Sequence, residues 1–257
     1  MKIVILSPQP WAHNKISKHH YALEFAKNHE VYFINPAESG FAKHKIRNED
    51  GVNIVDFGTG LPDWIKFKLR SIYKLRITQK LQKLISQIQG VDLLVDFGCY
   101  GMFENLEAFQ SKNKIYFPVD DSPEINSDRG ADLIFTISTV IQNKLEQLGH
   151  SCNWINHGVA AEFINAESYR VIKQIETETH VGISGNIFIP FIDREIFIKI
   201  LKENPRVKFH LFGKTHEPDS LQKKDKEFID VLSNLKNVIF RGFYSTGDLA
   251  IELNKMD

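Results

Sequence analysis

Two adjacent carboxylates, Asp120 and Asp121, are the residues whose type and position most directly suggest chemistry. They follow a short apolar run, residues 115–117, and the prolines at 118 and 123 flank them in a predicted turn. Two neighbouring carboxylates repel each other, which can raise the pKa of one of them toward the range of a general base. The alternative is that both only stabilise the turn.

The elements around this pair predict an exposed catalytic edge. Residues 132–137 form a second apolar run, and Ser138 is typical of the N-cap of a helix that closes at Gly149. In a sheet that alternates strands with helices, loops at the carboxyl ends of the strands form the binding crevice. The loop of Asp120 and Asp121 and the loop of residues 98–101 should therefore open into it.

Three histidines, His13, His19 and His20, precede or begin the first predicted helix, residues 16–28, where a substrate could reach them. Their spacing fits no metal site, and a solvated or structural role is the alternative for each. The flanking strands, residues 2–7 and 30–34, complete a βαβ unit. This unit lacks the Gly-x-Gly-x-x-Gly turn of dinucleotide binding, which disfavours a nicotinamide or flavin enzyme.

Composition limits the function classes. The chain has 257 residues and is 42% hydrophobic, which is enough apolar sequence to form folded hydrophobic cores. Its 32 basic and 32 acidic side chains balance, which argues against a general nucleic-acid binder. Cys99 and Cys152 lack metal-ligand spacing and are expected as reduced thiols. No apolar run is long enough to span a membrane, and no signal peptide is evident, so we expect a soluble, cytoplasmic protein.

The longest helical pattern, residues 64–88, has an apolar stripe and seven basic residues without one acid. Mixed charges stabilise ordinary solvated helices, so a one-sign face is unusual. The pattern predicts docking on an anionic membrane surface through Trp64, Lys66, Arg70 and Lys74. The alternative is a core-packed helix whose basic face is only hydrated.

Strand and helix patterns restart near residue 180. Strands are expected at residues 181–186, 207–212 and 238–240, with helices between them. We therefore predict an α/β protein with two doubly wound, Rossmann-like domains in tandem: residues 1–165 with a seven-stranded, mainly parallel sheet, a linker at residues 166–178, and a smaller second domain at residues 179–257.

Three segments together resemble the nucleotide-sugar glycosyltransferases of the GT-B fold, in particular the bacterial branch that acts on cell-surface polysaccharides and lipid-linked sugars. Residues 11–36 are similar to the family's first βαβ unit. Residues 131–138 with the Ile-Asn-His-Gly-Val segment at 155–159 resemble its "aD.v.t.S…pNGv" pattern. Residues 181–214 resemble the opening of the donor domain, with its glycine turn.

The resemblance implies transfer of a sugar from a nucleotide-sugar donor to a hydroxyl or lipid-linked acceptor, with no bound metal and no other cofactor. Asp120 or Asp121 would then be the base, with His19 or His20 as the substitute. It further implies a donor site formed by backbone N–H groups at a helix N-terminus, positive charge and aromatic side chains. The expected donor-binding residues are Gly185, Asn186, Arg194, Lys214, Phe243 and Tyr244.

The same comparison shows two departures from the family pattern. Basic residues that usually follow the donor-domain glycine turn are missing before Arg194, and the chain stops at Asp257, where the family continues. We therefore expect a fragment or a shortened relative with an incomplete second domain. The competing hypotheses are a non-catalytic scaffold of the same fold and a sugar-nucleotide epimerase.

Overall fold

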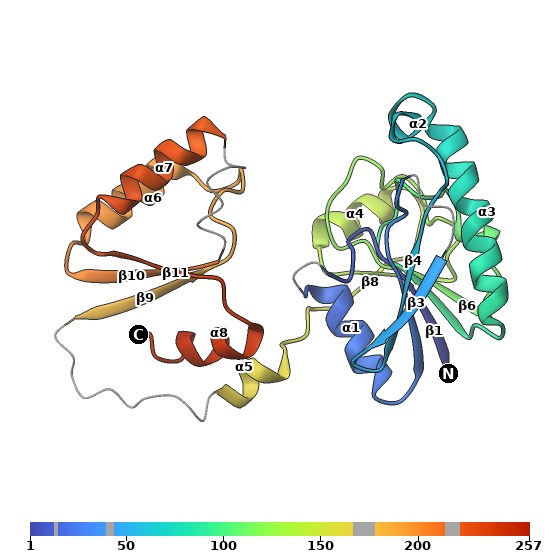
Figure 1. Ribbon diagram of the computed structural model, residues 1–257, viewed down its shortest axis with the longest axis horizontal. Coiled ribbons are helices and arrows are strands. Elements are labelled where there is room, and N and C mark those ends of the chain that lie inside the picture. The colour runs from blue at the N-terminus through green and yellow to red at the C-terminus, as the bar shows by residue number, and fades with distance from the viewer. Residues whose placement is uncertain (13–14, 40–43, 167–177, 214–221) are drawn as a thin grey trace. The chain divides into compact units, whose positions relative to one another are not determined.

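The computed structural model describes residues 1–12, 15–39, 44–166, 178–213 and 222–257. These residues form two compact α/β units, Met1–Gly158 (unit 1) and Val159–Asp257 (unit 2), each with its own sheet (Figure 1). The predicted tandem of two α/β domains is confirmed. The division falls before residue 165, because helix α5 (Ala161–Asn165) packs against α8 (Thr246–Leu253) of unit 2. Most of the expected linker lies outside the described residues.

Unit 1 is built on a sheet of strand order β3-β4-β2-β1-β5-β6-β7-β8, parallel except for β3. Its strands are β1 (Lys2–Leu6), β2 (Glu30–Ile34), β3 (His44–Glu49), β4 (Val52–Phe57), β5 (Leu93–Asp96), β6 (Asn113–Tyr116), β7 (Leu133–Thr136) and β8 (Asn153–Trp154). Its helices are α1 (Ser17–Ala26), α2 (Asp63–Lys68), α3 (Arg70–Ile88), the short 3₁₀ helix η1 (Leu106–Ala108) and α4 (Thr139–Gln147).

The prediction of seven strands in unit 1 was wrong by one strand. The eighth, β3, pairs antiparallel with β4 at the edge of the sheet, and its side chains are mostly exposed. Its sequence is His-Lys-Ile-Arg-Asn-Glu and has no apolar run. A charged sequence is tolerated at a sheet edge and discourages pairing with other chains, so composition alone does not reveal such a strand.

The central strand β1 shows why the parallel sheet has cores on both faces. Val4 and Leu6 belong to the cluster that packs against α3 and α4, while Ile3 and Ile5 belong to the cluster around α1. All four side chains are at most 2% exposed. Successive side chains on a strand point to opposite faces, so a strand that is buried on both faces is apolar throughout.

The single helix predicted over residues 64–88 is two helices. The backbone of Leu69, with φ −129° and ψ 57°, ends α2 and begins α3. Helix α3 buries Tyr73, Ile77, Leu81 and other members of the predicted apolar stripe against the sheet, whereas α2 buries no residue fully. The sequence pattern did not reveal the break at Leu69, because a one-residue interruption leaves the spacing of the apolar residues almost unchanged.

Unit 2 has the three predicted strands, all parallel, in the order β11-β10-β9. They are β9 (Thr179–Ser184), β10 (Val207–Phe212) and β11 (Val238–Gly242). Helices α6 (Arg194–Glu203) and α7 (Lys223–Ser233) cover one face of this sheet and α8 the other (Figure 1). A Cβ on Gly182 would lie 2.6 Å from Leu253, so this glycine allows α8 to pack closely on β9.

Candidate functional site

The carboxyl edge of the unit 1 sheet brings together loops from three parts of the chain. The loop after β1 holds Gln9, the loop after β5 holds Cys99, and the loop after β6 holds Asp120 and Asp121. Parallel strands place these loops at one edge because their carboxyl ends all point the same way. The sequence prediction that the acidic loop follows a buried strand in this sheet agrees with the topology.

A buried lysine, Lys18, lies at this edge and was not expected from the sequence. Its side chain is 0% exposed and its ammonium group donates a hydrogen bond to the side-chain oxygen of Gln9. Burial lowers the pKa of Lys18, and the nearby Cys99 and Asp120 oppose that shift. Lys18 is therefore an internal cation that attracts the carboxylate of Asp120. A Lys-His-His run carries no periodic signal that would have identified it.

His19 is part of the core rather than an exposed base. Its ring is 0% exposed, stacks on Phe33 and tilts against Trp11. The backbone N–H of Ile16 donates to Nδ1 at 3.1 Å, so Nε2 carries the proton, which it donates to the carbonyl of Pro10 at 3.2 Å. Burial lowers the pKa of His19 to about 4. Both ring nitrogens have backbone partners, which leaves neither to receive a substrate proton.

The remaining predicted bases differ in their surroundings. Asp120 and Asp121 are both exposed, and Asp121 forms an ion pair with Lys144 at 3.3 Å. Lys144 also donates to the carbonyl of Ser122 at 2.7 Å, which ties this loop to α4. His20 is half-buried on α1, and His13 lies outside the described residues.

In unit 2, the carboxyl ends of the three strands form an edge of glycines. The N–H of Gly185 donates to the carbonyl of Phe212 at 2.9 Å, and the N–H of Gly213 donates to the carbonyl of Gly242 at 2.7 Å. Gly213 has φ +132°, and a Cβ there would lie 2.2 Å from the Gly185 oxygen. Only glycine fits at this contact, so the edge presents backbone to any ligand that lies on it.

The predicted donor-binding groups of unit 2 already have protein partners. The N–H of Gly185 donates to the carbonyl of Phe212, and the Asn186 side chain accepts from the N–H of Phe188 at 3.0 Å. Asp193 caps α6 by accepting from the second and third N–H groups of that helix. Arg194 pairs with Asp225 at 2.6 Å and donates to the carbonyl of residue 224.

The remaining predicted donor-binding residues are two aromatic side chains and one lysine. Phe243 is 67% exposed, and Tyr244 is half-buried with its ring edge against Phe212. Both follow β11 and therefore lie at the glycine edge. Lys214 lies outside the described residues. Within the described ranges, no three histidine, cysteine or acidic side chains are grouped in a way that could hold a metal ion.

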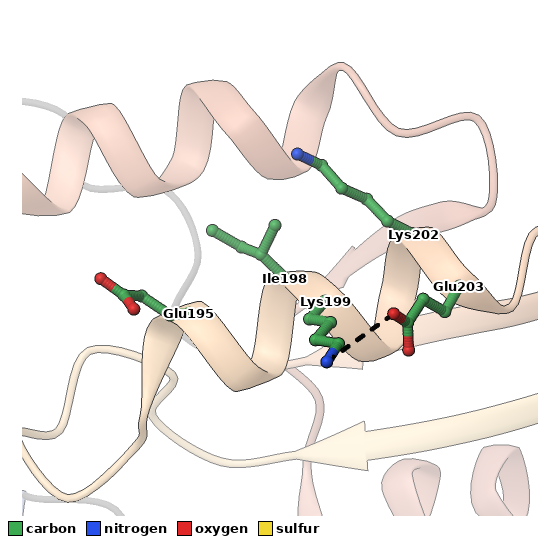
Figure 2. A pocket seen from close by; sticks show the side chains of 5 residues that line it. All are labelled: Glu195, Ile198, Lys199, Lys202 and Glu203. Atoms are coloured by element: carbon green, nitrogen blue, oxygen red, sulfur yellow. Dashed lines mark ion pairs between the residues drawn. The ribbon is translucent and has the colours of Figure 1, made fainter.

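A shallow hollow of about 400 Å³ on α6 is not a convincing binding site. Figure 2 shows that its lining side chains come from one helix, where Lys199 pairs with Glu203 at 3.9 Å. Polar groups of a ligand site converge from several elements, whereas these belong to one helix surface.

The predicted membrane-facing residues have mixed surroundings. Trp64 is 53% and the neighbouring Phe67 79% exposed on α2, and Lys66 is exposed beside them. Arg70 and Lys74, by contrast, form ion pairs with Glu124 and Glu104. No helix in the described part of the chain has the length and apolar character needed to cross a bilayer.

Solved structures with a similar fold match this chain over nearly its whole length. The chain aligns over 99% of its length with 73% of a sucrose-phosphate synthase from Thermosynechococcus elongatus, at TM-score 0.67 and 12% identity. It aligns over 100% of its length with 73% of HepE from Anabaena, solved with UDP and glucose, at TM-score 0.61 and 16% identity. An α,α-trehalose-phosphate synthase (UDP-forming) from Burkholderia vietnamiensis matches over 98% of this chain and 74% of its own, at TM-score 0.60 and 12% identity.

These matches extend through both units, so the chain has the GT-B fold of two Rossmann-like domains that its sequence resembles. No protein-family model matches the sequence. No curated protein matches it either.

Proposed function

We propose that this protein is a glycosyltransferase that moves a sugar from a nucleotide-sugar donor to a hydroxyl acceptor. The observation that carries the proposal is the likeness of the whole chain, rather than of one domain, to a sucrose-phosphate synthase and to HepE, which was solved with UDP and glucose. A single Rossmann-like domain supports many functions, whereas this tandem arrangement is shared by the matched structures.

The residues of each unit suit a part of this reaction. In unit 2, nothing lies within 4 Å of the Cβ positions of Gly185 and Gly242, so a diphosphate can approach the backbone there without a side chain in its path. In unit 1, Asp120 is an exposed carboxylate with the buried cation of Lys18 nearby. We assign the donor to unit 2 and the acceptor to unit 1.

Asp120 is the base that we favour. Its carboxylate would take the proton of the acceptor hydroxyl as that oxygen forms a bond to the anomeric carbon. The bond from that carbon to the diphosphate breaks, and its electron pair leaves with the nucleoside diphosphate. Asp121 is less suited because Lys144 pairs with it, and His19 because both of its ring nitrogens are bonded to backbone.

Calorimetric titration with a panel of UDP- and GDP-sugars tests the proposal. We expect one nucleotide class to bind with a stoichiometry of one. Absence of binding to every member of the panel would instead favour a non-catalytic scaffold of the same fold. Conversion of the donor sugar to its epimer in the absence of any acceptor would favour the epimerase.

We further propose that unit 1 docks on an anionic membrane surface and takes an acceptor used in cell-surface polysaccharide or glycolipid assembly. Large apolar side chains are exposed along α2 and the first half of α3: Trp64, Phe67, Leu69, Ile72 and Leu75. Exposed lysines, Lys66 and Lys68, lie among them. Exposed large apolar side chains with basic neighbours are typical of an interfacial helix, and each basic residue near anionic lipid contributes about 1 kcal/mol.

Vesicle co-sedimentation tests this docking. The protein should bind vesicles that contain anionic lipid but not neutral ones, and salt should weaken the binding. The double variant Lys66→Glu/Lys68→Glu should lose it, because both lysines are exposed. The matched control, Lys199→Glu/Lys223→Glu, changes two exposed charges in unit 2 and should retain it. Equal binding to neutral and anionic vesicles, or none to either, would contradict docking.

A further inference from the structure

A cavity of about 370 Å³ opens in unit 1 between the start of α3 and the loops that follow β5 and β6. Its lining includes three basic side chains, two carboxylates and a tyrosine: Arg70, Lys74, Arg129, Glu104, Glu124 and Tyr100. The volume is sufficient for a small ligand. Unlike the hollow on α6, this cavity is lined by groups from several chain segments.

The inner wall of the cavity is a fixed guanidinium. Arg129 is 5% exposed, donates through Nε to Asp96 at 2.9 Å and through Nη2 to the carbonyl of Phe103 at 3.0 Å. These bonds use two of the five N–H groups of an arginine. The backbone of Arg129 has φ +55°, a left-handed conformation that is costly for a residue other than glycine. Position and orientation are therefore held by the fold.

Tyr100 adds a phenolic hydroxyl to the lining of the cavity. Its oxygen lies 2.7 Å from the hydroxyl of the buried Tyr116, and the Arg129 guanidinium lies over its ring at 5.2 Å. Burial raises the pKa of Tyr100 to about 12, so the hydroxyl stays protonated at neutral pH. Asp96 balances the charge of Arg129, so an anion would be attracted chiefly by the cations at the rim.

The rim consists of two cations that are held by displaceable carboxylates. Lys74 donates to Glu104 at 2.5 Å, and Arg70 pairs with Glu124. The Lys74 side chain is only 12% exposed, whereas that of Glu104 is 75% exposed. Packing therefore positions the lysine, while the glutamate is free to move into solvent. The Arg70–Glu124 pair is exposed on both sides, and such pairs stabilise a protein by at most about 1 kcal/mol, so a better anion can replace that carboxylate.

We propose that this cavity binds a phosphoryl group of the acceptor, which replaces Glu104 and Glu124 as the partner of Lys74 and Arg70 and faces Arg129. The identity of the ligand as the acceptor rests on the proposed function, whereas the presence of an anion site rests on the cavity alone. The loop that contains Asp120 continues into Glu124, so the proposed base and the wall of the cavity belong to the same loop. A soluble sugar phosphate and a lipid-linked phosphate share this chemistry.

Titration of the full chain with a hexose monophosphate and with short-chain phosphatidic acid tests the proposal and distinguishes the two sources. Lys74→Gln should weaken binding of the phosphate at least about tenfold, because a charge-assisted hydrogen bond is lost. Glu104→Gln should strengthen it about two- to fivefold, because the competing carboxylate is gone. The control Lys83→Gln removes an equal charge from an exposed position of α3 outside the cavity and should leave the affinity unchanged.

The opposite signs of the two variants separate a ligand site from a structural salt bridge. Tighter binding of the sugar phosphate assigns a soluble acceptor, and tighter binding of the lipid phosphate assigns a lipid-linked one. The proposal is overturned if Lys74→Gln binds like the wild type, if Glu104→Gln weakens binding, or if neither probe binds to Glu104→Gln. Nucleotide-sugar titration of the same samples reports on the proposed function separately, since that ligand is assigned to unit 2.

Discussion

The carboxylate of Asp120 is the single side chain on which the proposed chemistry depends most. Asp120→Asn should lower the rate of sugar transfer about 10²- to 10⁴-fold, because a positioned general base contributes that much. Donor affinity should remain unchanged, since the donor is assigned to unit 2. Asp121→Asn is the matched control and should lower the rate less than about tenfold, because Lys144 holds that carboxylate. Full transfer activity in Asp120→Asn would exclude it as the base.

His19 makes stability depend on pH. Its pKa is about 4 in the folded protein, against 6.5 for an unperturbed histidine, because burial disfavours the imidazolium. Between these values the unfolded state binds a proton that the folded state does not. Stability should therefore fall by about 3 kcal/mol as the pH decreases from 6.5 to 4, with full stability above 6.5.

Urea denaturation at pH 7, 6 and 5 measures this dependence. His19→Gln should be less stable at pH 7 and should show a flatter decrease than the wild type. The neighbouring variant His20→Gln keeps the buried ring and should keep the wild-type slope. An unchanged slope in His19→Gln would assign the pH dependence to other groups.

At the level of secondary structure, the glycine edge of unit 2, to which we assign the donor, depends on the close approach of the loops after β9 and β10. Gly213→Ala would place a Cβ 2.2 Å from the backbone oxygen of Gly185, which cannot move without disturbing the sheet edge. Gly149→Ala is a matched control, because its φ of +86° is also left-handed but nothing lies within 4 Å of its Cβ position.

The control variant should lose about 1–3 kcal/mol, the cost of a strained backbone conformation, whereas Gly213→Ala should lose more and should also lose nucleotide-sugar binding. Denaturation and calorimetry on both variants measure the two effects. Equal losses of stability in both would show that the loops relax around the added methyl group.

For the molecule as a whole, we expect unfolding in two steps. Two apolar clusters lie entirely within residues 1–158, and the third lies within residues 181–240. Units with separate cores need not unfold together. A fragment of residues 1–158 should therefore unfold cooperatively at one of the two midpoints of the full chain. A single transition in the full chain, with an unfolded fragment, would show that unit 1 depends on unit 2.

Local patterns in the sequence determined most of the fold. The central strand β1 of unit 1 is a continuous apolar run from Ile3 to Leu6, because a parallel strand in the middle of the sheet is covered on both faces. Ser138 caps α4 as predicted, with its side chain accepting from the N–H of Ile141 at 3.4 Å, and Gly149 follows the helix with φ +86°. Such signals can be read from sequence because caps and periodicity involve residues only a few positions apart.

Tertiary structure decided which polar groups meet, and much of the candidate site depends on that. The edge strand β3 and the break at Leu69 escaped prediction because neither has a distinctive local pattern. Lys18 is buried beside Gln9, and Arg129 lies against Asp96, 33 positions away in the chain. These partners are fixed by strand order and packing, since residues distant in sequence become neighbours only when the sheet assembles.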